Sequence, residues 1–456
     1  MIFYSLQFSL ILLLLTSLFA QNISEAKQPN IVFILSDDQA WSDYGFMGND
    51  KVATPNLDKL AKQGLTFKNG YVAAPICRPS LASIVTGVSP TVHGITGNDS
   101  NEPGSRAETD PKFRKVFHKY PNWIKSLTAA GYLTFQSGKW WEGTYQDGGF
   151  THGMTHADPK RKGRHGDAGL VIGRTGLEPI NEFIDHAQSK KKPFLVWYAP
   201  YLPHTPHNPP ADLLEKYTKA GHASDVAKYY AMCEWFDATC GELLSLIDKK
   251  DLTKDTVIIY ACDNGWSPVS TRADDPTQKD WRHYAQRSKS SPFQNGVRTP
   301  IMISWPGTIT PLDSSDLAHT TDIFPTVMAL AGLKAPSNLE GLNLTDPKAR
   351  ERRKFVFGVC HSSHNMTFDK PDETLQYLWV ASKDWKLIIR KNGLDKTRYI
   401  KLHEWDTEPH RLYRLSEDPN EKINYAVRVP TLVKQLTEIT EGWHSTNQRR
   451  RTIMQK

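Results

Sequence analysis

The beginning of the chain lacks charge. No charged side chain occurs between Ile2 and Ala20, and this stretch includes the apolar run Leu10–Leu15. A small residue, Ala20, followed by polar Gln21, is typical of a signal-peptide cleavage site. The apolar run is short for a membrane span, which needs about 20 residues. We therefore predict a signal peptide over residues 1–20 and export to the periplasm or the cell exterior, with a membrane anchor as the alternative.

The rest of the chain has no further long apolar run, so we expect no stable membrane insertion there. Internal repeats and nucleic-acid-binding motifs are also absent, although the net charge is +7 and the chain ends near Arg449-Arg450-Arg451. Such a basic face is either simply solvated or attracts a polyanionic substrate. With 39% apolar and 23% charged residues, the 456-residue chain is typical of one large globular domain plus a smaller one.

Cysteine is scarce. The chain has five cysteines and no Cys-x-x-Cys pair, so we expect no zinc ribbon. An odd number of cysteines in an exported protein indicates that one of them has a separate role. Cys233 and Cys240 are seven residues apart, on one face of an expected helix. The sequence leaves open whether they are buried thiols or partners in a disulfide.

Short β-branched and aromatic runs alternate with helical patterns up to about residue 304. Continuous apolar runs suit strands that are buried on both faces, and their alternation with helices predicts a parallel α/β sheet. The expected strands are residues 30–35, 132–135, 194–198, 256–260 and 301–304. The expected helices are residues 56–63, 123–130 and 228–249.

The pattern changes after about Gly332, where Pro336, Gly341 and Pro347 indicate a connection. The runs beyond it look like antiparallel strands, and a helix follows them. These strands are expected at residues 355–357, 377–382, 385–390 and 412–415, and the helix at about 430–444. We therefore predict a large domain over residues 29–333 and a smaller α+β domain over residues 350–456, which contains an antiparallel sheet.

Oxygen-bearing side chains directly follow two of the expected strands. Asp37 and Asp38 follow the first strand, and Asp263 and Asn264 follow the strand at 256–260. In open α/β sheets, ligands bind outside the carboxyl ends of the strands. Three carboxylates and an amide oxygen that converge there would suit Ca²⁺ or Mg²⁺ and would not suit zinc. Each pair alone also fits a turn or a helix N-cap.

Cys77 lies just before an expected helix. Pro79 and Ser80 suit a helix start, and the helix would continue through Thr86 and end at Gly87. Residue 77 would then face the positive end of the helix dipole, where an oxyanion is favoured. The alternative is a buried structural cysteine.

The segment around Cys77 resembles the signature of the type I sulfatase family, in which a cysteine two residues before Pro-Ser is oxidised to formylglycine. Other segments are similar to further family motifs, in the family's order, and the similarity covers nearly the whole mature chain. These segments are Thr86-Gly87 with His93-Gly94, Gly138-Lys139-Trp140, Ala199-Pro200 to His204-Thr-Pro206, Lys289 before Phe293-Gln-Asn-Gly296 and Arg298-Thr-Pro300, and Leu412-Tyr-Arg-Leu415 with Asp418-Pro419, Glu421 and Asn424.

The resemblance implies an alkaline-phosphatase-like α/β fold and the hydrolysis of sulfate monoesters by an arylsulfatase-like enzyme. It also implies formylglycine at position 77, made by a formylglycine-generating maturation enzyme, and a bound Ca²⁺. By this resemblance Lys139, Lys289 and His204 bind the substrate and take part in catalysis with residue 77, and either His204 or Lys289 protonates the leaving alcohol. The calcium ligands it implies are Asp37, Asp38, Asp263, Asn264 and the modified Cys77.

Two positions depart from the family pattern. The family usually has arginine where this chain has Leu81, and histidine where it has Trp141. Both family residues act on the formylglycine, so we expect another cation or imidazole to take their place. The candidates are Arg78, Arg298, His152, His156 and His165.

The substrate class follows from weaker signals. Thirteen tryptophans and seventeen tyrosines in an exported enzyme favour a sulfated carbohydrate, because aromatic rings offer flat apolar contacts to sugar faces, although aromatic residues also fill cores. The alternatives are a phosphodiesterase or phosphonate hydrolase of the same superfamily and a non-catalytic protein that binds sulfated glycans. Intact Cys77 and the four metal-ligand candidates favour an enzyme.

Overall fold

The computed structural model describes residues 28–99, 111–157, 169, 171–267, 287–361, 366–367, 370–391 and 408–455. The signal peptide predicted at residues 1–20 lies outside these ranges. Among the described residues, no helix combines the length and the apolar character that crossing a membrane requires.

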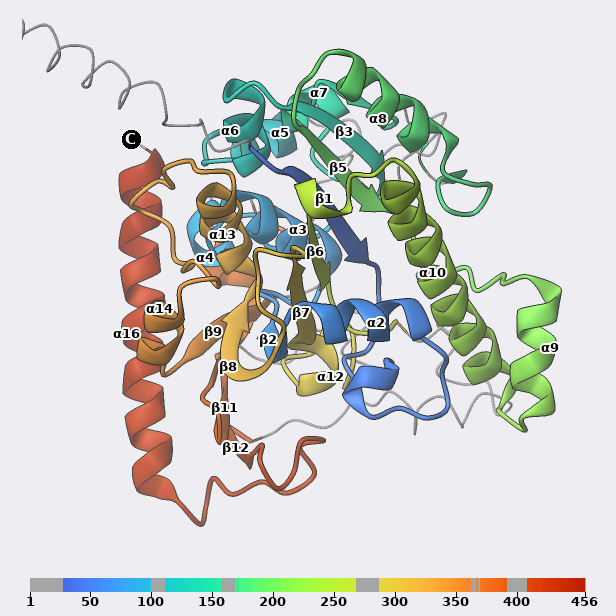
Figure 1. Ribbon diagram of the computed structural model, residues 1–456. Helices are drawn as coiled ribbons and strands as arrows, with labels where there is room; N and C mark the ends of the chain where they lie inside the picture. The colour runs from blue at the N-terminus through green and yellow to red at the C-terminus, as the bar shows by residue number, and fades with distance from the viewer. Residues whose placement is uncertain are drawn as a thin grey trace, which may run out of the picture.

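A central eight-stranded sheet forms the core of the molecule (Figure 1). Five neighbouring strands, β4, β3, β5, β1 and β6, run parallel, whereas β7 is antiparallel to both β6 and β2, and β2 pairs in parallel with β8. In sheet order the strands are β4 (His152–Gly153), β3 (Leu133–Gly138), β5 (Phe194–Ala199), β1 (Asn30–Ser36), β6 (Thr256–Cys262), β7 (Arg298–Ser304), β2 (Leu65–Tyr71) and β8 (Leu312–His319).

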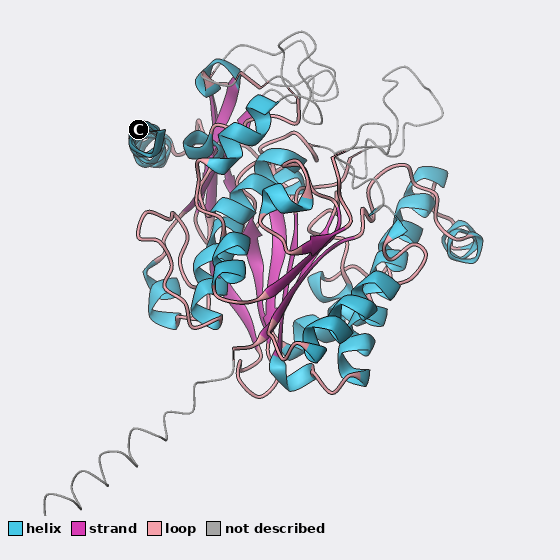
Figure 2. Cartoon of the chain, turned by 90° about the horizontal axis from the view of Figure 1, so that it is seen from above, coloured by secondary structure: helices cyan, strands magenta, loops and turns pink. Residues whose placement is uncertain are grey.

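Helices cover both faces of this sheet (Figure 2). Side chains alternate along β1, so Phe33 packs among residues of α3, α6 and α13, while Val32 and Ile34 pack among residues of α2, α8 and α10. This double burial explains the uninterrupted apolar run of β1. The helices are α3 (Cys77–Thr86), α6 (Trp123–Ala129) and α13 (Ile323–Leu330) on one face, and α2 (Pro55–Gln63), α8 (Glu178–Ser189) and α10 (Ser224–Lys249) on the other, with α9 (Ala211–Lys219) against α10.

Shorter elements connect these layers. They are η1 (Gly45–Met47), α4 (Pro90–His93), α5 (Pro111–His118), α7 (Tyr145–Gly148), η5 (Thr253–Asp255), α12 (Gln294–Val297), η7 (Thr320–Asp322), α14 (Pro347–Arg352) and η8 (Pro371–Thr374).

A second, four-stranded antiparallel sheet follows. Its strand order is β12 (His410–Arg414), β11 (Trp385–Arg390), β10 (Leu375–Ala381) and β9 (Val356–His361). One face of this sheet packs on Tyr71 of β2 and on Phe293, which directly precedes α12. The other face packs against α16 (Pro430–Gln455) through Leu436. We expected this last helix to end near residue 444, which was too short. No glycine or proline follows to end it, and buried Asn447 and Arg451 continue its packing toward α4.

Three strands of the large sheet were not expected from the sequence: the two-residue β4, β2 and β8. β2 contains Lys68, Asn69 and Gly70, and β8 begins with exposed Leu312 and Asp313, so neither shows a continuous apolar run. Antiparallel β7 also departs from an all-parallel sheet.

All five cysteines are buried free thiols. Cys233 and Cys240 both lie on α10, but they face different apolar clusters and form no disulfide. Burial as thiols is therefore the alternative that the structure supports for this pair.

Candidate functional site

The carboxyl ends of two central strands bring the acidic residues together. β1 and β6 pair in register, with Ser36 opposite Cys262, so the residues that follow each strand lie side by side. Asp38 adopts a left-handed backbone conformation (φ 61°), and its N–H donates to Oδ1 of Asp263 over 3.1 Å. Asp37, Asp38 and Asp263 are almost completely buried. The convergence predicted from strand ends is therefore present.

Asn264 completes this oxygen cluster. Its Nδ2 donates to Oδ1 of Asp38 over 2.6 Å. Two buried oxygens, Oδ1 of Asn264 and Oδ2 of Asp37, have no hydrogen-bond partner within the described part of the chain. Buried acceptors without donors are costly unless a cation or a water satisfies them. Two such oxygens beside two further carboxylates fit a hard divalent cation.

Cys77 is the first residue of α3, so the helix begins two residues earlier than the expected start at Pro79. Proline is tolerated in the first turn of a helix, because the N–H that it lacks has no intrahelical partner there. The Sγ of Cys77 lies 3.9 Å from Oδ1 of Asp38 and 3.1 Å from Nζ of Lys289. Burial raises the pKa of the thiol to about 11, against the opposing effect of Lys139 and Lys289. The unmodified residue is therefore a neutral thiol at neutral pH.

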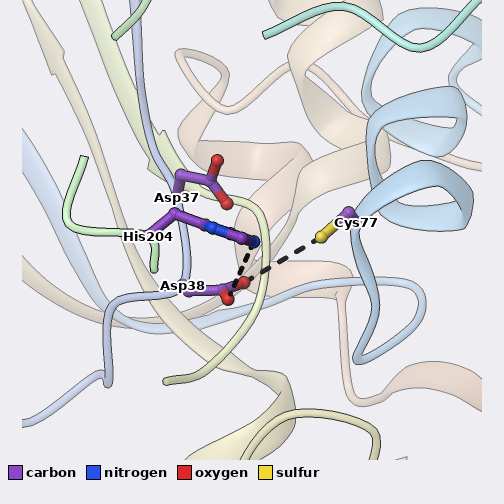
Figure 3. Close-up of side chains that lie close together, drawn as sticks. All are labelled: Asp37, Asp38, Cys77 and His204. Atoms are coloured by element: carbon purple, nitrogen blue, oxygen red, sulfur yellow. Dashed lines mark hydrogen bonds and ion pairs between the residues drawn. The ribbon is translucent and has the colours of Figure 1, made fainter. Parts of the chain in front are cut away.

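Figure 3 shows Cys77, Asp37, Asp38 and His204 facing a common centre from three different segments. One ligand atom from each of these four residues lies within 4.8 Å of the others. Apart from the adjacent Asp37 and Asp38, these residues are far apart in sequence, so the fold brings the three segments together.

Lys139 follows β3 and lies between two of the carboxylates. Its Nζ forms an ion pair with Asp37 and another, at 2.8 Å, with Oδ2 of Asp263. Gly138 makes this turn possible, since its φ is +75° and a Cβ there would lie 1.8 Å from the carbonyl oxygen of Ala199. Burial lowers the pKa of Lys139, but the neighbouring carboxylates raise it by more than burial lowers it. The pKa therefore lies well above its ordinary value. The ammonium therefore stays charged.

Lys289 contacts the same cluster through Asp38 and Cys77. Its Nζ lies 2.6 and 2.7 Å from the two carboxylate oxygens of Asp38. Burial raises the pKa of Asp38, and the attraction of Lys289, His204 and Lys139 outweighs it, so the pKa lies below its ordinary value. For Asp37 burial outweighs the effect of Lys139 and raises the pKa to about 6.

His204 comes from the loop after β5, where the Leu202–Pro203 and Thr205–Pro206 peptides are cis. Its Nδ1 lies 2.6 Å from the carbonyl oxygen of Thr205, which directs Nε2 to within 3.4 Å of Oδ2 of Asp38. Burial lowers the pKa of His204 despite the nearby carboxylates. An imidazole held in this way can exchange a proton at Nε2.

Sequence reasoning missed Tyr201. Its ring lies 4.4 Å from the ring of His204, and Nζ of Lys139 lies 5.8 Å from its centroid. Its φ of 59° is unusual for a tyrosine and favours a constrained loop. The sequence signal that could have identified Tyr201 is its position directly after Pro200, at the end of a strand.

The two departures from the family pattern are both buried in the apolar core. Leu81 and Trp141 belong to the cluster formed with α6 and α13. Beside them, Arg78 forms a buried bidentate ion pair with Glu142, with both N–O distances at 2.8 Å. The charge of Arg78 is therefore already balanced by a carboxylate.

The other candidates for replacing the family's arginine and histidine are Arg298, His152, His156 and His165. Arg298 donates to the carbonyl of Lys68 and stacks over Trp41 at 4.1 Å. His152 lies on β4 against Phe183 and His186. His156 lies 5.9 Å from the ring of Tyr145, and His165 lies outside the described residues.

Aromatic side chains mostly serve the core. The tryptophans at 123, 140, 197, 266 and 379 are among the largest fully buried side chains. The abundance of tryptophan therefore gives little support to a sugar-binding surface.

Comparison with known proteins identifies the family. The model of the sulfatase family matches residues 29–333, and that of the N-sulphoglucosamine sulphohydrolase C-terminal family matches residues 280–441. Human arylsulfatase A is 27% identical over 89% of this chain and 85% of its own length. The ulvan-active sulfatase of Formosa agariphila is 26% identical over 90% of this chain and 78% of its own length.

Solved structures show the same fold. The structure of Ps i-CgsB in complex with k-i-k-neocarrahexaose has a TM-score of 0.70 at 22% identity and covers 93% of this chain and 94% of its own. The PsFucS1 sulfatase from Pseudoalteromonas sp. has a TM-score of 0.67 at 22% identity, with 96% and 93% covered. The expected alkaline-phosphatase-like fold is confirmed, and the family match shows that this chain belongs to the sulfatases and is a sulfuric ester hydrolase.

Proposed function

We propose that this enzyme hydrolyses sulfate esters of a sulfated carbohydrate outside the cytoplasm, with a formylglycine at position 77 and a bound Ca²⁺. The observation that carries the proposal is the position of Cys77. It begins a buried helix, and its Sγ lies within 3.9 Å of an acidic cluster and 3.1 Å from a buried lysine. A thiol that served only to fill the core would not need charged neighbours of both signs.

Calcium fits the oxygens at the strand ends. Asp37, Asp38, Asp263 and Asn264 would hold the ion together with the modified residue 77, and two of their buried oxygens have no donor within the described residues. The ion would neutralise charge on the sulfate and hold the nucleophilic hydroxyl. Zinc is a poorer fit because the cluster is rich in oxygen.

The side chains around residue 77 suit the remaining chemistry. The hydrate of formylglycine supplies a hydroxyl that attacks sulfur and a second hydroxyl that allows sulfate to leave. Lys139 and Lys289 stabilise the negative charge of the sulfate oxygens, which would otherwise repel an anionic nucleophile. Asp263 assists removal of the proton from the nucleophile. His204 or Lys289 donates a proton to the departing alcohol.

A maturation enzyme is a required partner. The step oxidises the Cβ of Cys77 by two electrons to an aldehyde: oxygen replaces the sulfur, which leaves as sulfide, and an external oxidant such as O₂, used by the maturation enzyme, takes up the electrons. Because Cys77 is only 1% exposed in the fold, we infer that the modification precedes folding. Leu81, in place of the family's arginine, lies within the segment that this partner must accept.

A sulfated carbohydrate is the proposed substrate class. Relatives over most of the chain include the ulvan-active sulfatase and human N-acetylgalactosamine-6-sulfatase, which is 27% identical over 90% of this chain. Both names denote activity on a sulfated saccharide. The basic net charge of +7 agrees with a polyanionic substrate.

A panel of defined sulfated saccharides tests this proposal. The enzyme is produced with and without a formylglycine-generating enzyme, and released sulfate is measured alongside phosphate released from matched phosphate esters. We expect sulfate release only from matured protein, with the mass of formylglycine at position 77. Full activity with unmodified Cys77, or a preference for phosphate esters, would contradict the proposal. Binding of sulfated saccharide without any turnover by formylglycine-containing protein would support a binding protein.

A further inference from the structure

Glu421 lies in the loop after β12, where it joins the small domain to the large one. Its Oε1 lies 3.0 Å from Nζ of Lys386 on β11, with both side chains buried. Its Oε2 accepts the backbone N–H of Gln294 over 2.5 Å, and its own carbonyl accepts Nη1 of Arg287 over 3.0 Å. The residue is therefore fixed on one side by the small sheet and holds residues 287–294 on the other.

The segment that Glu421 holds carries Lys289. Arg287 and Ser290 flank this lysine with φ values of 57° and 66°, which non-glycine residues adopt only when the surroundings impose them. The N–H of Lys289 donates to the carbonyl of Trp266, and that of Ser290 donates to the carbonyl of Pro75. The Arg287 guanidinium also lies 4.5 Å above the ring of Phe293. Several contacts therefore fix the unusual backbone conformation around Lys289.

We propose that Glu421 is a positioning residue for Lys289. By accepting the N–H of Gln294, its carboxylate fixes the segment whose lysine lies 3.1 Å from Cys77 and 2.6 Å from Asp38. The inference rests on the proposed role of Lys289 at the sulfate ester. Small displacements of a catalytic group have large effects on rate, since about 1 Å can cost about 10²-fold. Lys386 balances the charge of Glu421, so the carboxylate can be buried at this joint.

The decisive variants change residue 421 without leaving a buried charge alone. In a Lys386→Met background, Glu421→Gln keeps an oxygen for the N–H of Gln294, whereas Glu421→Leu removes it. We expect the leucine variant to lose about tenfold or more in kcat/KM relative to the glutamine variant. The loss should appear mainly in kcat, since Lys139 and His204 would still bind the sulfate ester. Hydrogen exchange in peptides covering residues 287–297, measured by mass spectrometry, should be faster in the leucine variant.

A double-mutant cycle separates positioning from a general structural role. If Glu421 acts through Lys289, the difference between leucine and glutamine at 421 should shrink to less than about twofold once Lys289→Ala is present. A structural role would preserve the full difference in that background. Glu340 provides the matched control, because its half-buried carboxylate also accepts a backbone N–H, that of Ser89, and binds Asn447 of α16. Glu340→Leu and Glu340→Gln should not change exchange at residues 287–297.

Each outcome decides between explanations. Unchanged exchange at residues 287–297 in the Glu421→Leu variant overturns the positioning role, whatever the activity. Faster exchange with an unchanged kcat/KM overturns it as well. Full activity of Lys289→Ala with intact exchange behaviour would instead remove Lys289 from the proposed mechanism, and this result does not depend on any variant of Glu421.

Discussion

Asp263 connects Lys139 to the two strand ends of the site. It accepts the N–H of Asp38 and pairs with Lys139 over 2.8 Å. We expect Asp263→Ala to abolish calcium binding and to lower kcat at least about 10²–10³-fold, because the proposed roles of Asp263 as a calcium ligand and in deprotonating the nucleophile would be lost together. Isothermal titration with Ca²⁺ and steady-state kinetics on the matured enzyme check the two effects separately.

Asp346 gives a control for this substitution. It caps α14 by accepting the N–H of Lys348 over 2.9 Å, and it is not one of the residues at the strand ends. Asp346→Ala should cost about 1 kcal/mol of stability and leave calcium affinity unchanged. Retention of both calcium binding and turnover by Asp263→Ala would mean that the acidic residues at the strand ends are only turn formers.

Leu81 and Trp141 replace two polar family residues with apolar ones, and both are now core residues. Restoring the family pattern with Leu81→Arg and Trp141→His would place a cation in an apolar cluster beside the Arg78–Glu142 pair. We expect a lower melting temperature and no rise in kcat/KM, since burying a charge without a partner is costly. Both quantities are measured on matured protein with the true substrate.

A single apolar replacement shows how the core tolerates a change at position 81. Leu81→Met keeps apolar volume and should leave stability within about 1.5 kcal/mol of the wild type. A rise of about a hundredfold in kcat/KM for the double variant, comparable to one restored charged hydrogen bond, would show that the natural site is impaired.

The turn after β3 depends on a glycine for two reasons, its positive φ and the close approach of the Ala199 carbonyl. We expect Gly138→Ala to displace Lys139 and to destabilise the fold by about 3 kcal/mol or more, because the new Cβ meets backbone. Gly131→Ala is the matched control, since Gly131 also has a positive φ but a Cβ there would meet nothing within 4 Å. It should cost only about 1–2 kcal/mol and spare kcat. Equal losses of activity in the two variants would contradict the steric explanation.

The elements that the sequence predicted well are those with strong local signals. β1, β5 and β6 are continuous apolar runs, and α10 has a long helical pattern, so their positions follow from periodicity. β2 and β8 were missed because their polar and exposed residues hide the pattern, and pairing within the sheet stabilises them.

At the site, too, some positions could be predicted from local sequence signals and others could not. Asp37, Asp38 and Asp263 could be placed together in advance, because parallel neighbours end at the same edge of a sheet. The ion pair of Arg78 with Glu142 and the stacking of Tyr201 on His204 could not, since these contacts join segments whose relative positions only the complete fold determines. The catalytic and metal-binding roles of the site residues remain predictions.

Across the whole molecule, buried histidines make stability sensitive to acid. Burial lowers the pKa of His319 to about 4 and that of His361 to about 3. The unfolded chain binds these protons near pH 6.5, so stability falls as pH drops from about 6.5 toward these lower values. At pH 5 each histidine should cost about 2 kcal/mol relative to neutral pH.

Chemical denaturation at pH 7 and pH 5 checks this expectation. The double variant His319→Gln/His361→Gln should lose less stability between the two pH values than the wild type does. Equal losses would show that other groups determine the acid sensitivity. His186 is exposed on α8, so His186→Gln serves as the comparison variant.

The long sequence separation within the site would limit the time available for the proposed maturation of residue 77. Cys77 contacts Lys289, which the ribosome adds 212 residues later. At about 5–20 residues per second, the interval between the synthesis of the two residues is roughly 10–40 s. During that interval Lys289 is not yet part of the chain, so the site around the thiol is incomplete and the proposed modifying enzyme can act before it forms. Slower translation between these codons should therefore raise the fraction of formylglycine, and a shortage of the modifying enzyme should leave a folded, inactive fraction that later treatment does not rescue.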